Sequence, residues 1–287
     1  GIVHCQRRLI AVGRQRIGKH VGALGMGPPI VLWPRLAFGV GLDQQATEIG
    51  DDAVDLVRLV PPPLLYEWIE RTAPDLFRRI QAAVRAGRWE IVGGWQTQSD
   101  CNLPSGESFA RNALYSQRYF QEKFGRYCRT GYCVDSFGHC GSLPQLLQLG
   151  GLRYYTFMRP WPDQDPGLPE GPFVWEGTDG TRVTAFHIYR NYGCGHKKEL
   201  RENVDLIAQA APPVAMSFFG VGDHGGGPTR KLLDRIPQIQ QERPGVTLIF
   251  SSTAKYFEAL APHLKGLPVY RGETGTHSVG CYTSHAG

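Results

Sequence analysis

The stretch from Tyr132 to His139, Tyr-Cys-Val-Asp-Ser-Phe-Gly-His, carries the clearest chemical potential in the sequence. An apolar run leads to the Asp135 carboxylate, a turn of small residues follows, and residues 143–149 have the apolar pattern of a helix that ends at a glycine pair. The order strand, carboxylate, loop and helix places Asp135 at the carboxyl end of a strand, where α/β folds gather their reactive groups. Asp135 is therefore the first catalytic candidate.

Three other segments carry groups that could act together with Asp135. Asp100 lies in a loop after an expected strand, Asp223 and His224 open a glycine-rich loop, and His277 lies in the polar cluster at 273–282. Carboxylates and histidines that meet at strand ends suit acid–base chemistry, a metal site, or both. The spacing of these aspartates alone would also fit residues that cap helices. The glycine run after Asp223 lacks the Lys and Ser/Thr of a phosphate-binding loop.

For several other polar or aromatic residues, a purely structural role is the alternative to a role in the site. His139 could be either a loop hydrogen-bond partner or a ligand, and His187, inside an expected hairpin, fits a structural role better. Trp161 and Trp175 are typical of core or surface aromatics, with stacking on a sugar ring as the alternative.

From Leu64 to about residue 260, segments with helical periodicity alternate with short apolar strands. Ser105 is a plausible helix cap. The expected helices are 64–87 with a bend at Pro74, 107–124, 143–149, 197–210, 228–241 and 253–260, and the expected strands are 89–92, 132–134, 154–157, 216–221 and 246–250, with a hairpin at 173–188. This alternation predicts an α/β fold: a mostly parallel sheet, or an incomplete seven-stranded β/α barrel, with flanking helices.

The first 60 residues differ from the rest in composition and in the periodicity of their apolar residues. They are rich in arginine and glycine and lack a sustained period, so only a strand at Ile30–Trp33 can be predicted there. The sequence starts without methionine and stops just after a motif, and we expect it to be a piece of a longer protein.

Composition narrows the classes of protein. The 31 basic residues exceed the 26 acidic ones only slightly and are spread along the chain, which argues against nucleic-acid binding. No apolar run is long enough to cross a bilayer, and the N-terminus lacks a signal-peptide pattern. Seven scattered cysteines without a CxxC pair favour a reducing compartment, and hence a cytoplasmic location.

Five segments together resemble glycoside hydrolase family 38, the retaining α-mannosidases, and most of all its bacterial branch. They occur in the family's order from about residue 64 to the end. They are 87–94 (GRWEIVGG), Asp100 with 104–108 (PSGES), 135–139 (DSFGH), 222–229 (GDHGGGPT) and 277–282 (HSVGCY). The resemblance implies a barrel-like α/β catalytic domain that binds one Zn²⁺ and hydrolyses terminal α-D-mannosyl residues of oligosaccharides by double displacement.

The resemblance also assigns roles by position. Asp135 matches the residue that is both nucleophile and zinc ligand, and His277 matches a late histidine ligand. Arg159 matches an arginine beside the nucleophile. Asp223 falls in the loop that supplies the acid/base, a role that a shift of one position would give to His224. Asp100, like Arg159, is expected to bind substrate.

The sequence departs from the family at its start. The family's early His-x-Asp pair, which supplies two further zinc ligands, does not occur anywhere in the chain. We therefore divide the chain into an atypical segment at 1–63, a catalytic domain at 64–270 and the start of a following region at 271–287. A shifted reading frame or a replacement upstream of residue 64 would explain the change. We expect weak or no zinc binding and little activity from the chain as it stands.

Two other functions remain open at this stage. A metal-dependent deacetylase acting on polysaccharides also uses Asp and His on a similar barrel, and would release acetate rather than mannose. A carbohydrate-binding fragment without catalysis would keep the pocket and lose the chemistry.

Overall fold

The computed structural model describes residues 29–34, 62–193, 197–209, 214–220, 228–243 and 245–282. The chain forms two compact units. The first unit contains residues 1–60, 79–90 and 191–260, and the second unit contains residues 61–78, 91–190 and 261–287. Among the described helices, none has the length and apolar character needed to cross a membrane.

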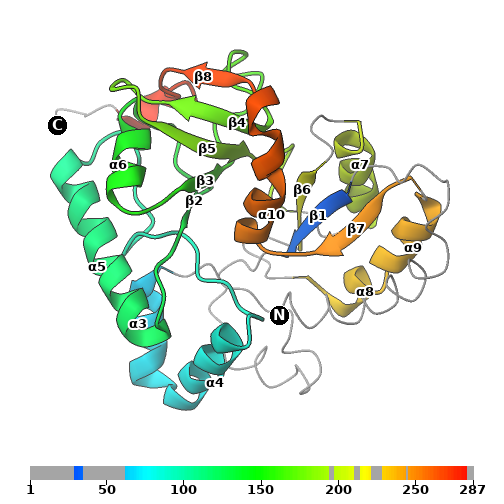
Figure 1. Cartoon of the computed structure of the whole chain (residues 1–287), viewed down its shortest axis with the longest axis horizontal. Helices are drawn as coiled ribbons and strands as arrows, with labels where there is room; N and C mark the ends of the chain where they lie inside the picture. Colours follow the sequence, from blue (N-terminus) through cyan, green and yellow to red (C-terminus); the bar gives the residue numbers. More distant parts are fainter. Residues whose placement is uncertain are drawn as a thin grey trace. The chain divides into compact units, whose positions relative to one another are not determined.

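The second unit is built on a five-stranded sheet (Figure 1). Its strands, in spatial order, are β2 (Thr130–Cys133), β3 (Tyr154–Phe157), β5 (Arg182–His187), β4 (Gly171–Glu176) and β8 (Val269–Arg271). Three of the four pairings are parallel, and β4 and β5 form the predicted antiparallel hairpin. The prediction of an α/β fold with a mostly parallel sheet is therefore confirmed.

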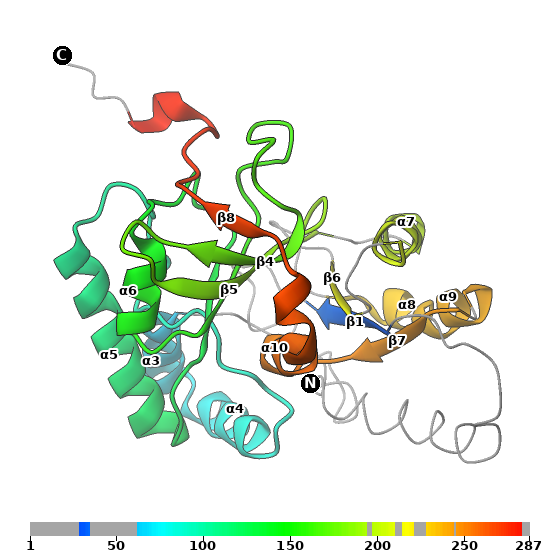
Figure 2. The ribbon, with the colours of Figure 1, turned by 45° about the horizontal axis from the view of Figure 1, so that its top comes forward.

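Helices accompany this sheet. They are α3 (Pro63–Thr72), α5 (Gly106–Phe124) and α6 (Leu143–Leu149), and two 3₁₀ helices, η2 (Ala261–Gly266) and η3 (Val279–Tyr282), come later in the chain. Ser105 caps α5 as predicted, since its side chain accepts a hydrogen bond from the Ser108 N–H. β8 forms the edge of the sheet opposite β2, and Figure 2 shows the chain leading from β8 to η3.

Aromatic side chains dominate the core of the second unit. A first group lies on and between α3 and α5, and a second lines the sheet, where the Tyr155 and Phe157 rings stack at 5.4 Å. The fully buried members are Tyr66, Phe120, Tyr155, Phe157, Phe173, Trp175 and Phe186. Burial of such large rings supplies much of the driving force for folding and gives the strand ends a rigid base.

Two predicted elements differ from the structure for reasons that involve proline. The expected bent helix at 64–87 is two helices, α3 and α4 (Pro74–Arg85), separated at Ala73. The expected helix at 228–241 is also two, α8 (Arg230–Leu233) and α9 (Ile236–Glu242). Proline has no N–H to donate to the preceding turn, so it is tolerated in the first turn of a helix and not further along. Pro74 is accordingly the first residue of α4, and Pro237 is the second residue of α9.

The predicted strand at 89–92 is wrong. In this region the structure has only an isolated parallel bridge between Gly93 and Gly131. Gly93 has φ of 101° and Gly94 has φ of 71°, and these left-handed conformations end the extended path at once. A side chain at Gly94 would also collide with Leu152, so this close approach requires glycine.

The first unit contains a three-stranded parallel sheet in the order β6-β1-β7, with β6 at Ala215–Phe219, β1 at Pro29–Pro34 and β7 at Thr247–Phe250. The predicted strand at 30–33 is confirmed and lies in the centre. Besides α8 and α9, the helices α7 (Lys197–Ile207) and α10 (Thr253–Leu260) belong to this unit.

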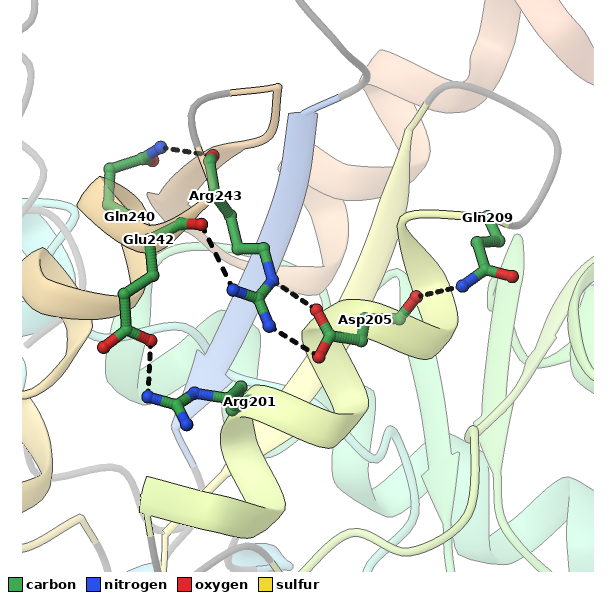
Figure 3. A network of polar contacts seen from close by, with 6 residues as sticks. All are labelled: Arg201, Asp205, Gln209, Gln240, Glu242 and Arg243. Carbon is green, nitrogen blue, oxygen red and sulfur yellow. Dashed lines mark hydrogen bonds and ion pairs between the residues drawn. The ribbon is translucent and has the colours of Figure 1, made fainter.

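A polar network joins α7 to the end of α9 (Figure 3). The Arg243 guanidinium binds both oxygens of the Asp205 carboxylate, and Arg201 donates to Glu242 at 2.6 Å. The Gln240 side chain accepts from the Leu248 N–H at 2.6 Å and so ties α9 to β7. Exposed ion pairs of this kind each contribute only about 0–1 kcal/mol, and we assign the network an orienting role.

The Glu90 carboxylate caps α10 and gives a first testable prediction. It accepts hydrogen bonds from the N–H groups of Thr253 and Ala254 at 3.1 and 2.9 Å, and from the Thr253 hydroxyl. Glu90→Ala should lower the free energy of unfolding by about 1–2 kcal/mol in urea denaturation, because these donors lose their acceptor. Glu258→Ala, an exposed change in the same helix, is the control and should change it by less than about 0.5 kcal/mol. Equal effects from the two changes would contradict the capping role.

Candidate active site

Asp135 lies two residues beyond the last residue of β2, on a loop that the neighbouring backbone holds in place. The strand is buried throughout, whereas the Asp135 side chain is 45% exposed. Ser136 stabilises the turn: its hydroxyl accepts from the Cys101 N–H at 2.9 Å and donates to the Gly138 carbonyl at 3.1 Å. The carboxylate is therefore available to solvent on a well-fixed backbone.

Arg159 lies two residues beyond β3, the parallel neighbour of β2, and so reaches the same edge of the sheet. Its Nε lies 4.0 Å from Asp135 Oδ1. The guanidinium carbon also lies 5.2 Å from the ring centre of Trp161 and 5.6 Å from that of Phe137, which fits cation–π contact. The buried Nε has no hydrogen-bond partner within the described part of the chain. Two aromatic faces thus hold a positive charge beside the carboxylate.

His277 approaches the same guanidinium from the segment after β8. Its Nε2 lies 3.4 Å from Arg159 Nη1, its Nδ1 lies 2.7 Å from Gln164 Oε1, and its ring packs edge-on against Phe137 at 4.7 Å. Burial, and then the positive charge of Arg159, lower the pKa of the imidazole. Arg159 lies next to both Asp135 and His277. These three residues therefore form one cluster, which we call the rim cluster.

His139 lies beneath the rim cluster and is fully buried. Its Nε2 is 3.0 Å from the Arg159 carbonyl and its Nδ1 is 3.0 Å from the Tyr155 hydroxyl. Its backbone pairs with Thr274 in both directions. Burial lowers the pKa of the imidazole to about 3, so the ring is neutral and donates from Nε2 to the carbonyl. Of the two alternatives for His139, the structure favours the hydrogen-bonding role.

Gly138 permits the close approach that brings the His277 segment to the rim. A side chain at this position would collide with the Thr274 carbonyl oxygen and with the Asn102 side chain. The backbone of the loop after β2 can therefore pack directly on residues 274–275, three residues before His277.

Asp100 belongs to the second unit but has a partly structural role there. Its Oδ1 accepts from the N–H groups of Asn102 and Leu103, both at 2.8 Å, and so closes its own turn. Burial and the nearby Asp100 carboxylate raise the pKa of Tyr282, which places η3 close to this loop. A role of Asp100 in binding substrate stays a prediction. Asp223 and His224 lie outside the described residues.

The donor set of the rim cluster does not complete a zinc site. A tetrahedral site takes three or four protein ligands, and the cluster supplies two, Asp135 and His277, which both contact a guanidinium. Within the described ranges, no group of three or more His, Cys, Asp or Glu side chains could hold a metal ion. The residues that the structure describes therefore do not by themselves fit the ion that the resemblance implies.

Three features of the site have no local signal in the sequence: the role of Gln164, the packing of Phe137 against His277, and the contact between Trp161 and Arg159. Gln164 lies in a short proline-containing loop whose side chains follow no period, and it carries no catalytic signal of its own. The only indication available was its distance along the chain from Arg159, five residues.

Together these features describe an α/β catalytic domain with a carboxylate at the carboxyl edge of its sheet. Comparison with known proteins is more specific: residues 60–273 match the family model "Glycosyl hydrolases family 38 N-terminal domain". The chain belongs to glycosyl hydrolase family 38, as the resemblance predicted.

Individual relatives agree with this family. The chain is 34% identical over 233 residues to alpha-mannosidase G of Dictyostelium discoideum, covering 77% of this chain and 21% of that protein. It is 32% identical over 226 residues to human alpha-mannosidase 2C1, covering 77% and 22%. The chain thus spans about a fifth of the length of these relatives. The crystal structure of an alpha-mannosidase from Enterococcus faecalis shares the fold, with a TM-score of 0.68 at 21% identity over 86% of this chain and 31% of that chain.

Proposed function

We propose that this chain is the N-terminal catalytic part of a glycosidase that removes terminal α-D-mannosyl residues from oligosaccharides. The family and the relatives named alpha-mannosidases support the substrate class. The observation that carries the assignment within this chain is the exposed Asp135 carboxylate at the end of a buried strand, with the Arg159 guanidinium 4.0 Å away.

In this proposal the reaction is a double displacement with Asp135 as the nucleophile. One Asp135 oxygen attacks the anomeric carbon, the bond from that carbon to the departing oxygen breaks, and an acid/base residue gives its proton to the departing oxygen. The same residue then removes a proton from water, the water oxygen attacks the anomeric carbon, and the bond to Asp135 breaks. Two inversions give net retention. Asp223 or His224 would supply the acid/base.

Arg159 has two tasks in this scheme. Its charge attracts the Asp135 carboxylate and orients it, and the faces of Trp161 and Phe137 restrict the movement of the guanidinium. Its unpartnered Nε could also donate to Asp135 or to a sugar hydroxyl after a small movement. Asp100 keeps a second carboxylate oxygen that could accept from a sugar hydroxyl.

Zinc content is the second testable property. Because the rim cluster brings only two donors and the sequence has no His-x-Asp pair, we expect the purified chain to hold much less than one zinc per chain after dialysis. Hydrolysis of a nitrophenyl α-mannoside should accordingly be slow. Elemental analysis and a colorimetric assay, with a version of the protein carrying a family-type His-x-Asp segment as the comparison, test this. One retained zinc per chain together with rapid hydrolysis would contradict it.

A deacetylase, the alternative enzyme, would release a different product from a different substrate. Acetate released from an acetylated polysaccharide, without mannose release, would favour a deacetylase.

The cysteine usage supports a reducing compartment, and we propose the cytoplasm.

A further inference from the structure

The loop after β3 contains a side chain with two hydrogen bonds to the rim cluster and its support. Gln164 Oε1 accepts from the Trp161 N–H at 3.0 Å and lies 2.7 Å from His277 Nδ1. The Gln164 N–H in turn donates to the Trp161 carbonyl at 2.9 Å. Gln164 is therefore fixed by its own turn, and its side chain cannot follow His277 freely.

These contacts determine which atom of the Gln164 amide faces the imidazole. A backbone N–H can only donate, so the atom opposite Trp161 N has to be the carbonyl oxygen of the amide. The same oxygen faces His277 Nδ1. An oxygen without a hydrogen only accepts, so Nδ1 has to carry a proton.

The opposite side of the imidazole gives the same answer independently. Arg159 Nη1, 3.4 Å from His277 Nε2, is a donor and has no lone pair to offer. Nε2 must therefore be the acceptor. One ring nitrogen faces a pure acceptor and the other faces a pure donor, and the neutral Nδ1–H tautomer is the form that satisfies both.

We propose that Gln164 is a positioning residue that holds His277 in the Nδ1–H tautomer, with the lone pair of Nε2 directed at the rim cluster. This inference deepens the proposed function and takes its catalytic meaning from it. In this tautomer His277 can accept from Arg159 or from a hydroxyl of the mannose ring, and it has no Nε2 proton to give to a departing oxygen.

Histidine-selective ¹⁵N NMR of the full chain tests the inference without any need for turnover. The spectrum should be taken well above the pKa of His277, and the signal assigned by its loss in His277→Asn. The unchanged protein should show the Nδ1–H pattern. Gln164→Met removes the acceptor at similar size, and the Nδ1–H population should fall by at least about threefold. Gln164→Glu keeps an acceptor for both donors and should restore it. The Gln164 side chain is partly exposed, so both variants should fold.

The outcomes separate this inference from the proposed function. An Nε2–H pattern in the unchanged protein, or the same Nδ1–H population in Gln164→Met and Gln164→Glu, would overturn the role of Gln164. If the tautomer responds as expected while no α-mannoside is cleaved, the positioning role stands and the proposed function fails. If cleavage is present, Gln164→Met should lower kcat/KM by about tenfold, and Gln164→Glu should recover most of it.

Discussion

Asp135→Asn should abolish covalent labelling of the chain by an activated fluorinated α-mannosyl fluoride. The amide is a far weaker nucleophile than the carboxylate, and it cannot form the glycosyl ester of the proposed first step. Because removal of a nucleophile can cost on the order of 10⁶-fold, the rate of labelling should fall by at least about 10³-fold, to background. Intact-mass and peptide mass spectrometry measure the adduct on the 135 peptide, and this readout is sensitive enough for a slow enzyme.

Asp163→Asn is the matched control. Asp163 is an exposed carboxylate four residues from Arg159, and its loss should leave labelling unchanged. The Asp135 side chain is 45% exposed, so its replacement should alter the free energy of unfolding by no more than about 1 kcal/mol. Labelling of Asp135→Asn at the normal rate would refute the nucleophile assignment. Mannose binding without turnover, unaffected by the substitution, would indicate a carbohydrate-binding fragment instead.

Acidification should destabilise the chain through His139. The folded protein holds this imidazole neutral with a pKa of about 3, whereas in an unfolded chain the imidazole has the ordinary histidine pKa of about 6.5. Between these two values the unfolded state binds more protons, so stability falls as the pH falls. The slope should be about 1.4 kcal/mol per pH unit, and the total change on the order of 5 kcal/mol over the whole window. In the neutral ring, the Tyr155 hydroxyl can donate a hydrogen bond to Nδ1 while Nε2 donates one to the Arg159 carbonyl. Protonation of Nδ1 would remove the acceptor for the Tyr155 hydroxyl.

Urea denaturation at several pH values between about 7 and about 5 measures this slope. His139→Gln keeps an amide donor for the Arg159 carbonyl and removes the titrating imidazole. The slope of its unfolding free energy against pH should therefore be smaller by about 1.4 kcal/mol per pH unit. It should also be less stable at neutral pH, because a buried ring is replaced by a smaller, more flexible group. His187 is present in both proteins and cancels in the comparison. His263→Gln, away from this core, should keep the steep dependence; the same dependence in His139→Gln would contradict the assignment.

Local patterns in the sequence predicted most elements of the fold because each is encoded over a few neighbouring residues. α5, α6, β3 and the β4–β5 hairpin lie where periodicity and turn residues predict them. The errors arise where a single residue overrides the pattern. Pro74 and Pro237 lie in the first turns of new helices, and the left-handed Gly93 prevents a strand.

The candidate site could be predicted only in part. Asp135 was found from its place after a strand, a local signal, whereas the roles of Arg159 and His277 came from the family resemblance. Their contact depends on packing between segments 118 residues apart, and no local pattern encodes it. The sequence fits two roles for His139, because burial of the ring decides between them. The role of Gln164 cannot be predicted locally, because it depends on which atom of another segment the side chain faces.

The arrangement β6-β1-β7 has a consequence for the atypical N-terminal segment. β1 pairs with β6 over Ile30–Pro34 and with β7 over Pro29–Leu32, and β6 and β7 are joined through it rather than to each other. A deletion that removed Pro29–Pro34 would leave β6 and β7 without a strand between them. Each would then expose an edge of unpaired backbone groups, which favours aggregation. Pro29–Pro34, in the segment that least resembles the family, is thus the central strand of this sheet. Removing it should lower the solubility of the protein.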